Sequence, residues 1–182
     1  MVEQRVVFRS VVESLFLRAL KGRVTPALKE RLRAEGLDLD GKLAAGYPAE
    51  MWARCVDAAA QLVYPTLLRE DAHWRLGEDY IRGYAESTLG RALFTLAKLA
   101  GPMKAIARME QNFRHGNNYV KTSFVQLSPT SVELWLSDVR GQPWFTGGVL
   151  IEGGRRVGAK NVRVEILQTI GRGCTYRVCW DA

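Results

Sequence analysis

Residues 111–119 read Gln-Asn-Phe-Arg-His-Gly-Asn-Asn-Tyr, and they divide the chain into two parts with different hydrophobic periods. Before this stretch, apolar residues recur every three or four positions, as on one face of a helix. After it, they alternate with polar residues, as on one face of a strand. The sequence therefore predicts an α+β fold, in which an N-terminal helical layer packs on a C-terminal antiparallel sheet of about 4–5 strands.

The two parts are expected to form a single domain over residues 1–182, with residues 1–113 mainly helical and residues 117–182 mainly in antiparallel strands. The length of 182 residues fits one domain, since domains usually hold about 100–200 residues. A chain of this size buries roughly 70% of the surface that it exposes when unfolded. A substantial core is therefore expected without disulfides or metals.

Helices in the first part are predicted from their end signals and apolar stripes. Ser10 and Glu13 have capping-box spacing, and Thr25 before Pro26 is a second start signal. The expected helices cover residues 10–21, 25–35, 48–64, 69–88, 89–100 and 103–112. Residues 89–100 are the most apolar of these and are expected to be the most buried.

Two glycines interrupt the helix predicted over residues 69–88. Gly77 and Gly83 lower helix propensity, and a glycine inside a helix indicates that a neighbouring backbone comes close to it.

Strands in the second part are predicted from alternation. They cover residues 119–124, 132–137, 144–152, 161–168 and 174–180. The third of these, Trp144 to Glu152, is loosened by Gly147 and Gly148. The last two form a hairpin around Gly171-Arg172-Gly173.

Composition excludes several classes of protein. The chain is 47% hydrophobic and 25% charged, and it has three cysteines, which is unlike a disordered chain or a disulfide scaffold. No apolar run approaches the length of a membrane span, and the N-terminus has no signal-peptide core. A cytoplasmic protein with free thiols is expected.

The net charge of +7 does not indicate nucleic-acid binding. Residues 1–110 carry +3 and residues 111–182 carry +4, and both signs are mixed along the chain. Nucleic-acid-binding proteins usually show a dense basic stripe with recognition residues. We therefore interpret the charge as a solvated basic surface.

Catalytic and metal-binding motifs are missing from the sequence. It has no phosphate loop, no H-E-x-x-H, no nucleophile elbow and no C-x-x-C. Cys174 and Cys179 are five residues apart, so in one regular strand they lie on opposite faces and cannot share a metal ion. No catalytic residue, metal ligand or cofactor is predicted, although haem and zinc stay open as alternatives through His73 or His115.

Two groups of residues are candidate ligand contacts. Aromatic residues at helical positions could enclose an apolar ligand, or they could be ordinary core packing; they are Trp52, Trp74, Tyr80, Tyr84 and Phe94. Trp135, Trp144 and Trp180 lie on the predicted strands. Polar residues at the junction of the two parts could bind an anion or polar ligand, or could simply end a helix; they are Asn112, Arg114, His115, Asn118 and Tyr119.

The order of several short motifs resembles an uncharacterised paralogous family expanded in myxobacteria. The motifs include Gly46-Tyr47-Pro48, Thr88-Leu89-Gly90, Gly116-Asn117-Asn118-Tyr119, Gly147-Gly148 and Tyr176-Arg177-Val178-Cys179-Trp180. That family is distantly similar to a superfamily of haem-NO-binding domains, vinyl-reductase-type sensor domains and small TRAPP tethering subunits. The resemblance implies a binding or sensing module, often dimeric, with a pocket between helices and sheet.

The chain departs from the haem-NO-binding pattern. Those domains ligate iron with a helical histidine and hold the haem propionates through a Tyr-x-Ser-x-Arg motif. Here Tyr119 is followed by Lys121 and Thr122, so the motif is missing.

Three functions therefore remain open. The first is a non-enzymatic ligand-binding or protein-interaction module, present as a homodimer, with a small apolar ligand between helices and sheet. The second is a haem or metal sensor that uses His73 or His115. The third is an enzyme that acts through residues 114–119.

Overall fold

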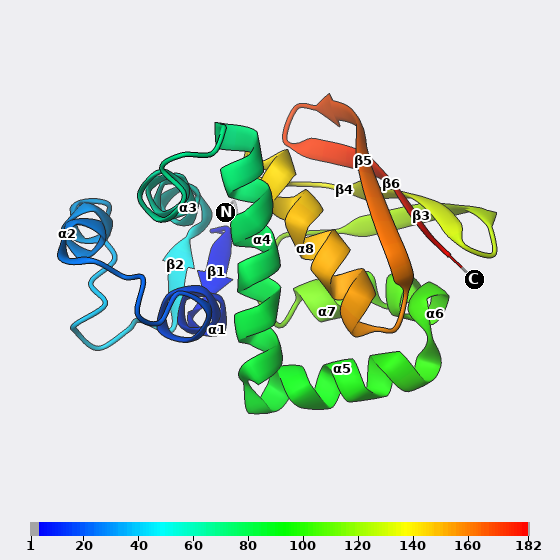
Figure 1. Cartoon of the computed structure of the whole chain (residues 1–182), viewed down its shortest axis with the longest axis horizontal. Helices are drawn as coiled ribbons and strands as arrows, with labels where there is room; N and C mark the ends of the chain where they lie inside the picture. Colours follow the sequence, from blue (N-terminus) through cyan, green and yellow to red (C-terminus); the bar gives the residue numbers. More distant parts are fainter. Residues whose placement is uncertain (1–3, 182) are drawn as a thin grey trace.

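The computed structural model describes residues 4–181 and is α+β, as predicted. Figure 1 shows α1–α3 and the β1–β2 pair at one end and a second sheet at the other, with α4 and α8 side by side between them. The helices are α1 (Arg9–Val12), the π-helical segment η1 (Glu13–Ala19), α2 (Pro26–Ala34), α3 (Ala49–Val63), α4 (Arg69–Glu86), α5 (Thr88–Ala100), α6 (Pro102–Ala107), α7 (Met109–Phe113) and α8 (Pro143–Arg156). The strands are β1 (Val6–Phe8), β2 (Gly46–Pro48), β3 (Thr122–Ser128), β4 (Ser131–Leu136), β5 (Lys160–Ile170) and β6 (Gly173–Asp181).

The larger sheet is antiparallel, with the order β3-β4-β6-β5. Its inner face is apolar, and Leu134 of β4 lies opposite the buried Tyr176 of β6. Its outer face is charged, because Arg177 bonds Glu133 at 3.0 Å and Glu165 at 3.4 Å. One face therefore packs on helices and the other faces water, as the alternation predicted.

The segment Trp144 to Glu152 is helical, so the strand predicted there is wrong. It lies within α8, whose first turn begins at Pro143. Gly147 and Gly148 do not loosen a strand; they let α8 lie against α4. A β-carbon on Gly148 would lie 2.0 Å from the Trp74 carbonyl oxygen, and one on Gly147 would lie 2.5 Å from the Trp74 ring.

The glycines of α4 confirm the prediction of close backbone approach. A β-carbon on Gly77 would lie 2.0 Å from the Phe145 carbonyl oxygen of α8. One on Gly83 would lie 1.9 Å from the Ser14 carbonyl oxygen of η1. Helix α4 is therefore packed at backbone distance against elements on both sides, which only glycine permits.

Helix α5 is the most apolar helix, but it is not the most buried one, so that expectation is wrong. Its only buried residue is Gly90, and Leu96 and Leu99 are 64% and 83% exposed. The sequence predicted the helix correctly but could not show that its outer face has no neighbour among residues 4–181.

The observed helix starts agree in part with those predicted from the sequence. Thr25 caps α2 as predicted, because its Oγ1 accepts a hydrogen bond from the Leu28 amide at 3.2 Å. The prediction that Ser10 caps the first helix is wrong. The first helix begins at Arg9, and the Ser10 hydroxyl donates instead to the carbonyl oxygen of His115. The helix predicted over 103–112 is two short helices, α6 and α7, which meet at Arg108.

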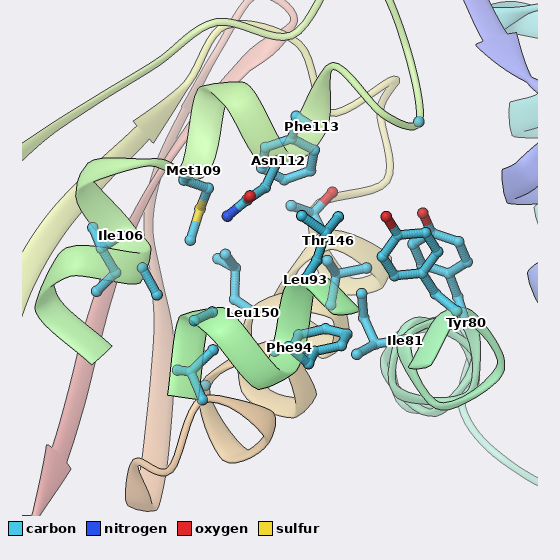
Figure 2. A pocket seen from close by; sticks show the side chains of 18 of the residues that line it. Tyr80, Ile81, Leu93, Phe94, Ile106, Met109, Asn112, Phe113, Thr146 and Leu150 are labelled. Carbon is cyan, nitrogen blue, oxygen red and sulfur yellow. The ribbon is translucent and has the colours of Figure 1, made fainter. Parts of the chain in front are cut away.

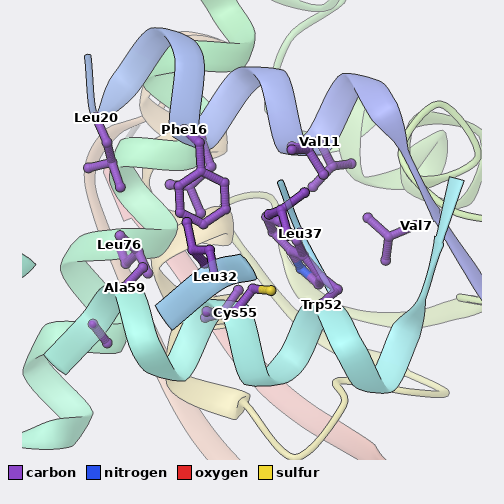
Figure 3. Close-up of a cluster of buried hydrophobic side chains, with 14 of the residues drawn as sticks. Val7, Val11, Phe16, Leu20, Leu32, Leu37, Trp52, Cys55, Ala59 and Leu76 are labelled. Carbon is purple, nitrogen blue, oxygen red and sulfur yellow. The ribbon is translucent and has the colours of Figure 1, made fainter. Parts of the chain in front are cut away.

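Two apolar clusters form the core. Figure 3 shows the first, in which Phe16 of η1 lies over Trp52 and Cys55 of α3. The second lies between α6, α8 and the sheet and includes Ile106, Leu150 and Tyr176. Among residues 4–181, no helix is both long and apolar enough to cross a membrane.

Candidate functional site

A cavity of about 170 Å³ lies where α4, α5, α7 and α8 meet the inner face of the sheet. Figure 2 shows Met109 and Asn112 pointing into it from α7, with Leu150 of α8 facing them. Most of the wall is apolar, including Ile81, Leu93, Phe94, Ile106, Met109 and Leu150. A concave apolar site with few polar groups is typical of small-molecule binding.

Helix α5 forms one wall of the cavity. Ser87 caps its start by accepting a hydrogen bond from the Gly90 amide at 2.9 Å, and Gly101 ends it with a φ of 87°. Leu93, Phe94 and Ala97 line the cavity from this helix. The principal neighbours of α5 are α4 before it and α6 after it, so the wall is attached mainly at its two ends.

Aromatic rings from α4, α5 and α8 also line the cavity. Tyr80 stacks on Phe145 with ring centroids 6.0 Å apart, and Tyr84 meets the edge of Phe94 at 6.2 Å. Burial raises the pKa of Tyr80 above its ordinary range, and the neighbouring Tyr84 adds to the rise while Arg140 opposes it. Burial also raises the pKa of Tyr84. Both phenols are therefore neutral at physiological pH and can donate a hydrogen bond.

Three buried polar atoms, on residues that line the cavity, have no hydrogen-bond partner among the described residues. They are Trp52 Nε1, Tyr84 Oη and Arg140 Nε. Native structures leave few such atoms unsatisfied, because a buried donor without a partner loses its hydrogen bond to water. All three atoms are donors, and the residues that carry them line one cavity, so this part of the protein has unused donors for an acceptor.

Arg140 reaches the cavity from the loop between β4 and α8. Its backbone is in the left-handed region, with a φ of 54°, and its amide donates to Asp138 Oδ1 at 2.8 Å. Its Nη1 donates to Tyr119 Oη at 2.5 Å, and its guanidinium lies 5.9 Å from the centre of that ring. The side chain is thus held in place on one side while Nε stays free.

Four of the five predicted helical aromatics do meet at this cavity. Trp52, Tyr80, Tyr84 and Phe94 line it, together with Trp180 from β6. Trp74 does not, because its ring covers Gly147 at the contact between α4 and α8.

The polar cluster is not brought together at the cavity. Of its members only Asn112 lines the wall. Arg114 and His115 are exposed, and Arg114 pairs with Glu110 at 2.9 Å. Asn118 holds the N-terminal strand, since its Oδ1 accepts from the Val6 amide at 2.8 Å. Tyr119 touches the site only through Arg140.

Several lining residues were not singled out from the sequence. Leu93 and Ala97 carry a helical spacing that marks one face of α5, and this signal could have identified them. Thr146 and Leu150 were hidden by the wrong strand prediction for this segment. Arg140 carries no local signal, because its role depends on elements far away in the sequence.

Neither histidine can serve the cavity. His73 is buried between α3 and α4, where its Nδ1 lies 2.7 Å from the Arg69 carbonyl oxygen and its Nε2 lies 2.7 Å from Asp57 Oδ1. Burial tends to raise the pKa of Asp57, but hydrogen bonds from His73 and Arg69 outweigh it and hold that pKa below its usual range. Both ring nitrogens of His73 are therefore engaged in a structural ion-pair cluster.

The residues of the wall do not fit haem. Neither a histidine nor a cysteine lines the cavity, and its phenols are kept neutral by burial. The resemblance implies a helical histidine, and the helical His73 of α4 does not line the cavity. Among residues 4–181, no three His, Cys, Asp or Glu side chains are grouped so as to hold a metal ion.

The cysteines occupy the places that the strand alternation predicted. Cys174 is buried on the inner face of β6, whereas Cys179 lies on the outer face, 3.2 Å from Ser131 Oγ. Cys55 is buried in α3, where burial raises the pKa of its thiol to about 12. No two of them are placed to act together.

Solved structures of H-NOX proteins have the same fold. A triple mutant of an H-NOX protein from S. oneidensis in the Fe(II) ligation state matches with a TM-score of 0.70 at 12% identity, over 96% of its chain and 95% of this one. Unliganded Fe(II) H-NOX from K. algicida matches with a TM-score of 0.66 at 10% identity, over 95% of each chain. A mutant of T. tengcongensis H-NOX matches with a TM-score of 0.68 at 10% identity, over 96% of its chain and 94% of this one.

These likenesses concern the fold alone, because identities of 9–12% leave the wall of the cavity free to differ. A search of curated proteins finds no match. The family described as "Protein of unknown function (DUF2378)" matches residues 5–181. The chain therefore belongs to the DUF2378 family.

Proposed function

We propose that this chain is a ligand-binding module of the H-NOX fold that binds a small, mostly apolar molecule without haem. The observation that carries the proposal is the cavity between α4, α5 and α8, whose apolar wall includes three unpartnered donors. Another protein of this fold is described as an oxygen-binding H-NOX domain, so a ligand in this architecture has a precedent. The proposal places the module in the cytoplasm, in agreement with its three free thiols.

The size of the cavity supports a ligand of about one ring. An engineered cavity of roughly 150 Å³ lined by aliphatic and aromatic side chains binds benzene, and the cavity here measures about 170 Å³. The proposed ligand therefore has a compact apolar body and one polar group, which accepts hydrogen bonds from the unpartnered donors of the wall.

Toluene is a suitable first probe, with the Met109 methyl group as the reporter. Met109 lines the cavity, so its methyl resonance, in protein labelled at the methionine methyl groups, shifts when the cavity is filled. We expect a saturable shift for the natural protein. A chain without saturable binding would overturn the proposal.

Helix α5 offers a matched pair of variants for this titration. Leu93→Trp fills the cavity, because Leu93 lines it, whereas Leu96→Trp adds the same ring to the exposed side of the same helix. We expect at least a tenfold loss of toluene affinity for Leu93→Trp and no loss for Leu96→Trp. Equal affinities in the two variants would place the toluene elsewhere. Ala97→Phe serves as a second filling variant if Leu93→Trp does not fold.

We also propose that two copies of the chain pair through β3, which is an edge of the larger sheet. An exposed edge strand presents unpaired backbone groups, and proteins usually protect such edges with charges or bulges. The other edge, β5, carries Lys160, Arg163 and Glu165 and has two register irregularities. Strand β3 reads Thr-Ser-Phe-Val-Gln-Leu-Ser and has no charge, and its one register irregularity lies near its end, between Gln126 and Ser128.

A second copy is the occupant that this edge fits. In an antiparallel pairing centred on Val125, each residue of β3 meets an uncharged residue of the other copy, so no like charges face each other. Val125 is 63% exposed, and Phe124 and Leu127 are exposed beside it. The pairing would join two four-stranded sheets and cover these side chains.

Light scattering after size exclusion tests the pairing. The natural chain should elute as a dimer, and Val125→Lys should shift it to a monomer, because two lysines would then face each other. Ile170→Lys is the matched control, since Ile170 is 67% exposed on the other edge strand, and it should remain dimeric. A monomeric natural chain, or a dimer lost only in Ile170→Lys, would contradict the proposal.

A further inference from the structure

Arg140 is a cation at the cavity without a counter-ion. Among residues 4–181, no carboxylate oxygen lies within 4.0 Å of its guanidinium, and the neighbouring carboxylate of Asp138 is paired with Arg5 at 2.5 Å and Arg172 at 3.7 Å. Asp138 meets Arg140 only through the backbone amide. A half-buried charge beside an apolar wall is costly unless an opposite charge faces it.

The guanidinium of Arg140 is bonded on one edge, and its Nε edge has no hydrogen-bond partner among the described residues. Tyr119 occupies Nη1, and Nε is buried without a partner. The N–H groups of an arginine form a rigid planar fork, which binds the two oxygens of a carboxylate side by side. Tyr84 and Trp52 supply two further unpartnered donors to the same wall. The wall thus offers a positive charge and donors but no acidic side chain.

We infer that the ligand of this cavity carries a carboxylate, bound by Arg140, on an apolar body of about one ring. The inference rests on the proposed function and narrows it to monocyclic aromatic or alicyclic carboxylates. The apolar part of the wall, around Leu93 and Leu150, holds the ring. Tyr80, which stacks on Phe145, lies near enough to Arg140 for the two groups to interact electrostatically.

Three probes of one shape separate the ring from the charge. Benzoate has both, benzamide keeps the shape with a neutral polar group, and toluene has the ring alone. Titrations at neutral pH, followed by the Met109 methyl resonance and by calorimetry, should give benzoate at least a tenfold higher affinity than benzamide. The charge-assisted fork to Arg140 is the reason for that preference.

Two arginine variants locate the charge. Arg140→Gln should remove the preference for benzoate over benzamide and leave toluene affinity within about threefold. Arg114→Gln is the control, because Arg114 is exposed and does not line the cavity, and it should behave as the natural chain does. Arg140→Lys keeps the charge without the fork and should keep part of the preference; it also replaces Arg140→Gln if that variant does not fold.

The possible results distinguish the two proposals. If toluene binds but benzoate and benzamide bind equally, the carboxylate inference is wrong and the proposed function stands. If the benzoate preference survives Arg140→Gln, the carboxylate is bound elsewhere and the inference is wrong. If none of the three probes binds, both proposals are overturned.

Discussion

At the scale of single residues, four glycines determine how closely the helices approach. Gly77 in α4 and Gly147 and Gly148 in α8 face each other across the central contact, and Gly83 faces η1. None of the four has a positive φ, so their role is to remove a side chain and not to permit an unusual backbone. The aromatic wall depends on this contact, because Tyr80 and Phe145 project from these two helices.

The first prediction compares two glycines of α8. Gly148→Ala would place a methyl group 2.0 Å from the Trp74 carbonyl oxygen, so the free energy of unfolding should fall by about 3 kcal/mol. Gly153→Ala has no atom within 4 Å of the new methyl group, so it should gain about 0.5–1 kcal/mol from its higher helix propensity. Urea denaturation of both variants measures the difference. Equal stabilities would show that α4 and α8 do not pack at backbone distance.

At the scale of elements, α5 and α8 show where sequence patterns lose information. The sequence predicted both the period and the bounds of α5, but hydrophobicity reports a preference for burial and not a neighbour that provides it. In α8, the glycines that fit against Trp74 removed the side chains whose spacing would have revealed a helix. Both errors arise because the missing information lies in another element.

Only part of the candidate site could be predicted from the sequence. Tyr80 and Tyr84 are four residues apart, so one helix face carries both, and both line the cavity. Arg140 could not be predicted, because a loop arginine beside a glycine is usually solvated. Its role becomes visible only in the structure, where the loop between β4 and α8 brings Arg140 against Tyr119 and the nearby carboxylate of Asp138 pairs with Arg5 instead.

The second prediction concerns the local stability of α5. Its outer face is exposed and it is attached mainly at its two ends, whereas α4 is packed on both sides. Amide hydrogens of α5 should therefore exchange through local opening, at a free energy at least about 2 kcal/mol below that of α4. Hydrogen exchange followed by mass spectrometry compares the two helices in one sample. Equal protection would mean that α5 opens only with the whole domain and is not a separate wall.

At the scale of the whole molecule, the chain shares its architecture with H-NOX proteins but not a wall that suits their cofactor. The match extends over 94–96% of the chain, so the helices and the sheet are arranged alike. Function depends on the side chains that line the interior and not on the fold alone. Here those side chains are mostly aliphatic and aromatic groups, with two neutral phenols, Arg140, and the polar side chains of Asn112, Asn117 and Thr146.

The third prediction is that this chain does not acquire haem. When it is produced in cells supplied with iron and a haem precursor, the purified protein should show no Soret band, whereas the S. oneidensis H-NOX protein prepared in parallel should show one. The reason is the wall itself: no histidine or cysteine lines it, His73 is bonded at both ring nitrogens, and His115 is exposed outside it. A Soret band that persists through desalting at one haem per chain would contradict this prediction. A His73→Ala variant would then test whether His73 is the iron ligand. The Soret band would be lost in this variant only if His73 breaks its contact with Asp57 and ligates the iron.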